Sequence, residues 1–183
     1  NYQKEHIHLD LKKVNEKYKD AFLRKTGEVL DSGWFINGEN CRLFELEFSE
    51  YCGTKHAVGV GNGLDALSLI LQAYIILGKL KEGDEVIVPS NTYIATILSI
   101  TQNKLVPKLV EPDAGTFNLD PQKVVSNITD KTKAILCVHL YGQLCDVNAL
   151  KKISDEHNLL LVEDSAQAHG ASLNLVKAGA FDN

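Results

Sequence analysis

Short apolar segments alternate with helical patterns along most of this chain, and that alternation restricts the folds open to it. The apolar segments cover residues 57–61, 85–89, 105–110, 134–140 and 159–162. Between them, apolar residues recur at the three- and four-residue spacing of an amphipathic helix, as Leu64, Leu67 and Leu71 do. Strands that alternate with helices are typical of a parallel sheet covered by helices on both faces. The pattern therefore predicts an α/β fold with a mainly parallel sheet.

The first part of the chain carries a different pattern. Residues 10–31 and 39–51 show helical periodicity, and a Gly-bounded loop between them contains Trp34 and Phe35. An exposed Trp–Phe pair has little reason to face water unless something covers it. We therefore expect helical segments and an aromatic loop in residues 1–56, and an α/β domain in residues 57–183.

The charge balance argues against two classes of partner. The 183 residues include 24 acidic and 19 basic side chains, which gives a net charge of −5. No basic excess exists to neutralise the phosphates of a nucleic acid or an anionic membrane surface, and no apolar stretch is long enough to span a bilayer. We expect neither nucleic acid nor membrane as a partner. Because the chain contains no methionine, we also expect it to be part of a longer protein.

The spacing of the cysteines favours neither a disulfide framework nor a metal site. No two of them form a CxxC pair. We expect buried thiols, a reducing, cytoplasmic location and no metal. His6 and His8 could reach a metal together, but a frayed terminal segment is the favoured interpretation. The four cysteines are Cys41, Cys52, Cys137 and Cys145.

The residues that follow each apolar segment are the candidates for ligand binding, because ligands bind at the carboxyl ends of parallel strands. Segment 57–61 leads into Gly63 and Leu64 at the start of a helix, where free backbone amides favour an anion such as phosphate. The spacing is GxGxG rather than GxGxxG, and no GK[ST] follows, so a nicotinamide cofactor and a P-loop are disfavoured. A tight turn that simply needs glycine is the alternative.

Three further side chains follow later segments. Tyr93 lies at a strand-to-helix turn and could stack on a flat ligand, with a core aromatic as the alternative. Asp164 ends a buried strand, where a carboxylate is tolerated if it meets a permanent positive partner such as the protonated ring nitrogen of pyridoxal 5'-phosphate (PLP). Gln167 could donate to a ring oxygen. The alternatives are a helix N-cap for Asp164 and a surface position for Glu163.

Together these segments resemble the DegT/StrS family of PLP-dependent nucleotide-sugar aminotransferases. The resemblance is carried, in family order, by SGWFINGENCRLFELEFSEYCGTKHAVGVGNGLDAL, GDEVIVPSNTYIAT, KTKAILCVHLYGQ and EDSAQAHGA. It implies the type I, aspartate-aminotransferase-like fold, of which the chain would hold most of the large PLP-binding domain. It also implies a homodimer that transfers an amino group from glutamate to a keto-deoxy sugar on a nucleotide. The members it resembles most aminate dTDP-3-keto-6-deoxyhexoses.

The resemblance also implies residue roles. Gly63 and Leu64 would offer amides to the cofactor phosphate, Tyr93 would stack on the pyridine ring, and Asp164 and Gln167 would contact the ring nitrogen and the phenolic oxygen. Trp34 and Phe35 would border the active site and the dimer partner. The lysine that carries the cofactor is expected beyond Asn183, and neither His139 nor Lys177 is assigned a catalytic step.

Two alternatives remain open from the sequence. One is a PLP-dependent sugar dehydratase of the same fold, in which a histidine replaces the lysine. The other is a truncated chain that acts as a binding or assembly module without catalysis.

Overall fold

The computed structural model describes residues 10–181, and its internal contacts separate two compact units, residues 1–44 and 45–183. The first unit contains Leu11–Glu16 (α1), Lys19–Ser32 (α2) and the start of Glu39–Cys52 (α3). The helix expected over residues 10–31 is thus divided in two. The boundary expected after residue 56, where helical periodicity gives way to the first apolar segment, remains a prediction about domains.

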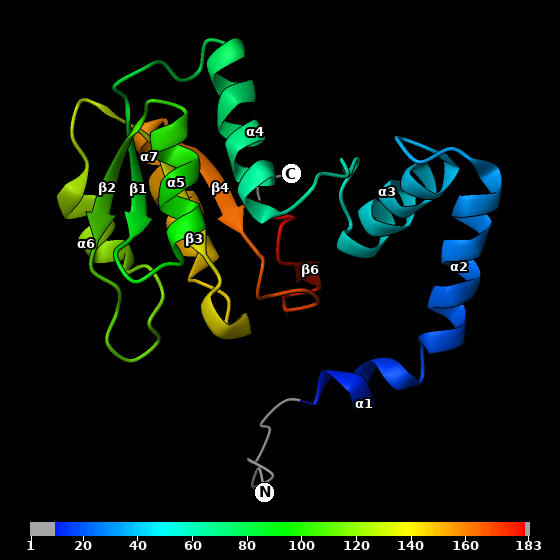
Figure 1. Cartoon of the computed structure of the whole chain (residues 1–183). Coiled ribbons are helices and arrows are strands. Elements are labelled where there is room, and N and C mark those ends of the chain that lie inside the picture. The colour runs from blue at the N-terminus through cyan, green and yellow to red at the C-terminus, as the bar shows by residue number, and fades with distance from the viewer. Residues whose placement is uncertain (1–9, 182–183) are drawn as a thin grey trace, which may run out of the picture. The chain divides into compact units, whose positions relative to one another are not determined.

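The second unit is built on a four-stranded parallel sheet with strand order β2-β1-β3-β4 (Figure 1). The strands are Glu85–Pro89 (β1), Val106–Val110 (β2), Thr132–Val138 (β3) and Leu160–Asp164 (β4). Strand β1 pairs in parallel with β2 and β3, and β3 pairs in parallel with β4. The α/β fold with a parallel sheet is therefore confirmed.

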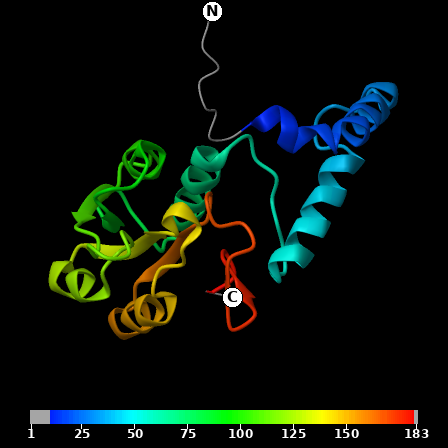
Figure 2. The same ribbon diagram turned by 90° about the horizontal axis from the view of Figure 1, so that it is seen from below.

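Helices cover both faces of this sheet (Figures 1 and 2). Gly63–Ile76 (α4) and Ile94–Gln102 (α5) pack on one face, and Pro121–Asn127 (α6) and Val147–His157 (α7) pack on the other. Because side chains alternate along a strand, Val86 and Val88 of β1 join the core under α4 and α5, whereas Ile87 joins the opposite core. Each fully buried aliphatic side chain contributes about 1.5–3 kcal/mol to folding.

One expected strand does not form. Residues 57–61 pair with no strand within the described part of the chain, and the Val58 side chain is 79% exposed. Strands are stabilised by paired neighbours and packed side chains, and glycines at 59 and 61 weaken this segment on both counts. The Gly59 N–H instead donates to the Glu45 Oε1 atom at 2.7 Å, so the segment serves as a connection into α4.

The cysteines and the C-terminal segment depart in part from expectation. Cys137 and Cys145 are buried as expected, but Cys41 and Cys52 are only partly buried because they lie on α3, most of which is exposed.

Strands Ser172–Leu173 (β5) and Val176–Lys177 (β6) form a small antiparallel hairpin that the sequence did not predict. His6 and His8 lie outside the described residues. No helix within residues 10–181 is long and apolar enough to cross a membrane.

Candidate functional site

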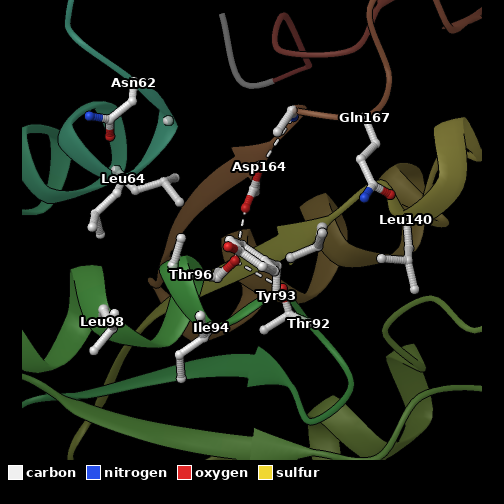
Figure 3. Close-up of a pocket in the computed structure, with 15 residues that line it drawn as sticks. Asn62, Leu64, Thr92, Tyr93, Ile94, Thr96, Leu98, Leu140, Asp164 and Gln167 are labelled. Atoms are coloured by element: carbon white, nitrogen blue, oxygen red, sulfur yellow. Dashed lines mark hydrogen bonds between the residues drawn. The ribbon is translucent and has the colours of Figure 1, made fainter.

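A pocket of about 520 Å³ opens where β1, β3 and β4 end, on the side of the sheet that α4 and α5 cover (Figure 3). Its volume lies in the range of small-molecule sites. Its position matches the rule that open α/β sheets bind ligands at the carboxyl ends of their strands. Apolar side chains form much of the wall, including Leu67, Leu98, Val138 and Leu140.

The structure brings five of the sequence-predicted residues together in this wall. They come from three separate segments: the start of α4, the turn before α5 and the end of β4 with the turn that follows. The five residues are Gly63, Leu64, Tyr93, Asp164 and Gln167. Trp34 and Phe35 belong to the first compact unit, where their side chains are 62% and 65% exposed.

Asp164 is the last residue of β4, and two hydrogen bonds hold its carboxylate. The Thr96 Oγ1 atom donates to Oδ2 at 2.9 Å, and the Ala166 N–H donates to Oδ1 at 3.2 Å. Turns rather than a helix follow Asp164, so the helix N-cap interpretation is wrong. The carboxylate is instead a fixed negative group at the pocket wall.

The start of α4 presents backbone N–H groups to the pocket. Asn62 caps the helix, because its Oδ1 atom accepts the Asp65 N–H at 3.0 Å. The first-turn N–H groups of Gly63 and Leu64 have no acceptor among residues 10–181. A Cβ atom placed on Gly63 would meet nothing within 4 Å, so packing inside the chain does not require glycine there. The open space and the unpaired donors fit an anion such as phosphate.

Tyr93 and Gln167 complete the polar part of the wall. Tyr93 precedes α5 and is 74% exposed, so the core-aromatic interpretation is wrong, and its ring is available to a flat ligand. The Gln167 Oε1 atom accepts the Tyr141 N–H at 2.7 Å. This hydrogen bond fixes the orientation of the amide, so its NH2 group is the end that can donate to a ligand.

Glu163 points to the opposite face of β4, where it forms a buried pair with His139. The two side chains are 6% and 0% exposed, and the Nε2–Oε2 distance is 2.9 Å. Because the His139 Nδ1 atom accepts the Cys145 N–H at 3.2 Å, the ring proton lies on Nε2 and is donated to Glu163. A surface position for Glu163 is therefore wrong: the strand turns its side chain inward, where it has donors.

Glu163 also connects β4 to the C-terminal segment. Its Oε2 atom accepts the Gly179 N–H and its Oε1 atom the Phe181 N–H, both at 2.9 Å. Burial raises the pKa of Glu163, but the hydrogen bonds from His139, Gly179 and Phe181 outweigh burial and hold the pKa below its usual value. The carboxylate thus stays ionised and ties the hairpin region to the strand that ends in Asp164.

Glu163→Gln is expected to destabilise the protein by about 2 kcal/mol at neutral pH, because an amide has one acceptor oxygen where three N–H groups need two. A lowered folded-state pKa stabilises the fold above the ordinary pKa, and this stabilisation is lost as the pH falls below about 4.3. The gap between wild type and variant should therefore close in acid. Chemical denaturation across pH measures it, with exposed Glu156→Gln on α7 as control. A gap that persists in acid contradicts the assignment.

A second buried cluster was not foreseen from the cysteine spacing. Cys137, His139 and Cys145 bring their possible ligand atoms within 4.8 Å of one another. Cys137 and His139 share a face of the chain at β3, and the turn Leu140–Gly142 (η1) returns Cys145 to them. The Cys145 Sγ atom donates to the Val138 carbonyl at 3.0 Å, and both His139 nitrogens have protein partners. Cys145 and His139 thus have hydrogen-bond partners inside the core.

Comparison with known proteins places this geometry in a family. Residues 16–183 match the DegT/DnrJ/EryC1/StrS aminotransferase family. The chain belongs to this family. The match extends over parts of both compact units and includes every residue of the pocket wall.

Individual family members show how close the likeness is. The chain is 51% identical over 173 residues to a dTDP-3-amino-3,6-dideoxy-alpha-D-galactopyranose transaminase of Aneurinibacillus thermoaerophilus, which covers 94% of the chain and 47% of that protein. The crystal structure of S. venezuelae DesV has a TM-score of 0.90 and 45% identity, over 95% of the chain and 46% of DesV. The chain therefore spans about half the length of these relatives.

The same fold also serves a dehydratase. The structure of an E. coli GDP-4-keto-6-deoxy-D-mannose-3-dehydratase with bound hydrated PLP has a TM-score of 0.83 and 32% identity, over 98% of the chain and 44% of that protein. This likeness is weaker than that to the transaminase and to DesV. The fold is thus shared with PLP-dependent enzymes, and sequence identity is higher to the aminotransferases among them.

Proposed function

We propose that the protein containing this chain is a PLP-dependent aminotransferase that acts on a keto-deoxy sugar carried by a nucleotide. The proposed substrate is a dTDP-3-keto-6-deoxyhexose, and glutamate is the proposed amino donor. The observation that carries the proposal is the Asp164 carboxylate, fixed by two hydrogen bonds at the wall of a largely apolar pocket. The names of the more similar relatives support the sugar and its nucleotide.

The pocket residues fit PLP in charge and shape. Asp164 would pair with the ring nitrogen, and the unpaired N–H groups of Gly63 and Leu64 would bind the phosphate at the start of α4. The exposed Tyr93 ring would cover one face of the flat cofactor, and the Gln167 amide would donate to its phenolic oxygen. PLP, when bound, supplies the electron sink through which an amino group passes from one carbon to another.

The chain's own contribution to the reaction is electrostatic and positional. Asp164 would place a negative charge next to the ring nitrogen of the cofactor and would so favour a proton on that nitrogen. The apolar side chains of Leu67, Val138 and Leu140 exclude water from the same wall, and this strengthens the attraction between the two charges. Gln167 and the start of α4 would hold the cofactor in one orientation.

We also propose that the protein works as a homodimer in the cytoplasm. Trp34, Phe35 and Ile36 form an exposed apolar run in the first unit, 62%, 65% and 79% exposed, which a second copy of the protein would cover. The thiol state of the cysteines supports a reducing compartment.

Assay of the purified full-length protein tests this function. With PLP, glutamate and a dTDP-3-keto-6-deoxyhexose, we expect the sugar carbonyl to become an amine while glutamate becomes 2-oxoglutarate, both followed by mass spectrometry. Loss of a hydroxyl oxygen from the sugar without gain of nitrogen, with ammonia released, would instead establish the dehydratase. Sugar binding without any reaction would establish the binding module. Sedimentation of the same preparation, beside a Trp34→Ala/Phe35→Ala variant, tests the dimer.

A further inference from the structure

Two threonines at the start of α5 form a hydrogen-bond chain that ends on Asp164. The Thr92 and Thr96 Oγ1 atoms lie 2.9 Å apart, and the Thr96 Oγ1 atom lies 2.9 Å from the Asp164 Oδ2 atom (Figure 3). A threonine hydroxyl has one proton to give, and an ionised carboxylate can only accept. Thr96 therefore gives its proton to Asp164, and Thr92 gives its proton to Thr96. Both hydroxyl protons therefore point toward the Asp164 carboxylate.

Neither hydroxyl is used in the way that helix starts ordinarily use them. A threonine next to a helix start commonly caps the first backbone N–H groups, but α5 has no side-chain cap bond. The Thr92 hydroxyl bonds to Thr96 across one helical turn instead. Thr96 is 1% exposed. Its carbonyl accepts a hydrogen bond from the hydroxyl of the buried Ser99 at 2.7 Å.

These two hydrogen bonds matter because the Asp164 carboxylate lies at the pocket wall, where it would face the ring nitrogen of the cofactor. In an apolar pocket, a carboxylate beside a protonated ring nitrogen can recover the proton, since a neutral pair costs less to bury than two charges. Hydrogen bonds to a carboxylate favour its ionised form. Thr96 and the Ala166 N–H supply one such bond to each oxygen. They stabilise the state in which the proton stays on the ring.

We propose that Thr96, supported by Thr92, is a positioning residue that keeps the Asp164 carboxylate ionised and aimed at the cofactor ring nitrogen. The proposal rests on the proposed function, because it needs a bound pyridine ring. The Ala166 N–H that bonds to Asp164 follows β4 directly, whereas Thr96 belongs to α5 and so supports the carboxylate from a separate helix. A merely structural Thr96 would only attach α5 to β4.

The test compares two ligands that differ at one atom. Pyridoxamine phosphate has the ring nitrogen, and its 1-deaza analogue has carbon in that place. In the full-length protein, Thr96→Val should weaken binding of pyridoxamine phosphate roughly 10-fold, because one hydrogen bond to a charged group is lost. Binding of the analogue should hardly change. Thr96→Ser should keep the wild-type preference. Thr101→Val, which removes a hydroxyl that donates to the Leu98 carbonyl near the end of the same helix, should leave the preference intact.

A direct readout is the ¹⁵N chemical shift of labelled pyridoxamine phosphate bound to each variant, which reports whether the ring nitrogen is protonated. We expect a shift toward the unprotonated value in Thr96→Val and a smaller one in Thr92→Val, which covers the case that Thr96→Val does not fold. Equal losses for both ligands, or an unchanged shift in both variants, would overturn the positioning role. Failure of the wild type to bind pyridoxamine phosphate would instead overturn the proposed function.

Discussion

Asp164→Asn is expected to lower the turnover of the full-length enzyme about 10⁴-fold, the size of the loss caused by an Asp-to-Asn change behind a catalytic ring in another enzyme. The amide carries no charge, so it no longer favours a proton on the cofactor ring nitrogen. The amide also has a single acceptor oxygen, and it can therefore keep either the Thr96 or the Ala166 hydrogen bond but not both. The fold should survive, at a cost of about 1 kcal/mol.

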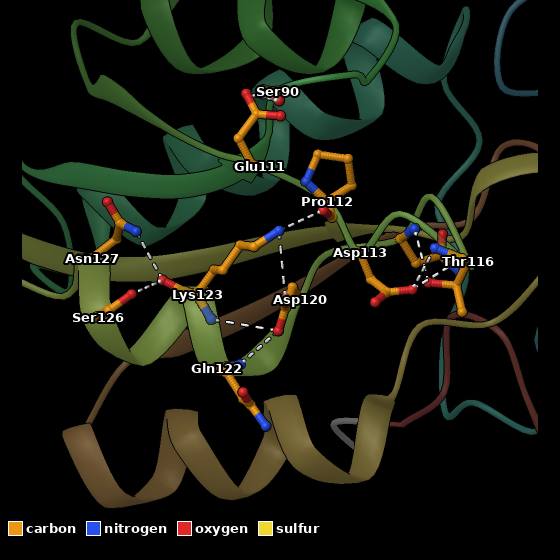
Figure 4. Close-up of polar contacts among 12 residues, drawn as sticks. Ser90, Glu111, Pro112, Asp113, Thr116, Asp120, Gln122, Lys123, Ser126 and Asn127 are labelled. Atoms are coloured by element: carbon orange, nitrogen blue, oxygen red, sulfur yellow. Dashed lines mark hydrogen bonds and ion pairs between the residues drawn. The ribbon is translucent and has the colours of Figure 1, made fainter.

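Turnover with glutamate and a keto sugar nucleotide, together with thermal unfolding, separates these two effects. Asp120→Asn is the matched control, because Asp120 accepts backbone N–H groups at the start of α6, outside the pocket wall (Figure 4). The control should change stability at most and leave turnover near wild type. Turnover of the Asp164 variant within tenfold of wild type would mean that another group controls the ring nitrogen.

The position of Asp164 was predictable because it depends on one local rule. A short apolar segment ending in a carboxylate predicts a buried strand whose last side chain reaches the ligand edge, and β4 ends at that residue. The fate of Glu163 was not predictable in the same way. Alternation turns it to the other face, but its burial depends on His139, Gly179 and Phe181, which are distant along the chain.

Other features depended on contacts or signals outside the apolar pattern. Residues 57–61 have a strand-like sequence, yet a strand also needs a neighbour, and none lies beside them in the described residues. Helix α6 begins with Asp120 and Pro121, which are favoured at the N-cap and first positions. The Lys123 Nζ atom then donates to the Pro112 carbonyl at 2.8 Å (Figure 4). Neither the Asp–Pro pair nor this contact belongs to the apolar pattern, so that pattern did not predict α6.

Thr96 was not among the residues predicted from the sequence, because it lies inside a helix and not directly after a strand. Its only sequence signal is the four-residue spacing from Thr92, which places both hydroxyls on one side of a helix start. The hydrogen bond to Asp164 joins two residues that lie 68 positions apart in the sequence, and it exists only once the sheet brings the end of β4 to the start of α5. The Asp164 carboxylate thus receives a hydrogen bond from a separate helix, and the residues that follow each strand do not indicate this bond.

Gly63→Pro is expected to weaken binding of pyridoxamine phosphate by about 2 kcal/mol, roughly 30-fold, by removing one N–H donor to the phosphate. Proline is well suited to the first position of a helix, where its missing N–H costs the helix nothing. Asn62 before it has φ −167° and ψ 176°, an extended conformation outside the α region that a following proline disfavours. The substitution therefore deletes a ligand contact while it preserves α4.

Gly63→Ala provides the control, because it keeps the N–H group and its Cβ atom meets nothing within 4 Å. It should bind pyridoxamine phosphate nearly as wild type does. Measuring each variant with pyridoxamine, which lacks the phosphate, isolates the effect: the proline variant should lose affinity for the phosphorylated ligand and not for the other. If Gly63→Pro binds both ligands as wild type does, the phosphate does not lie at the α4 start. An equal loss for both would place the damage in the pocket wall, and the unpaired amides of α4 would then have no part in holding the cofactor.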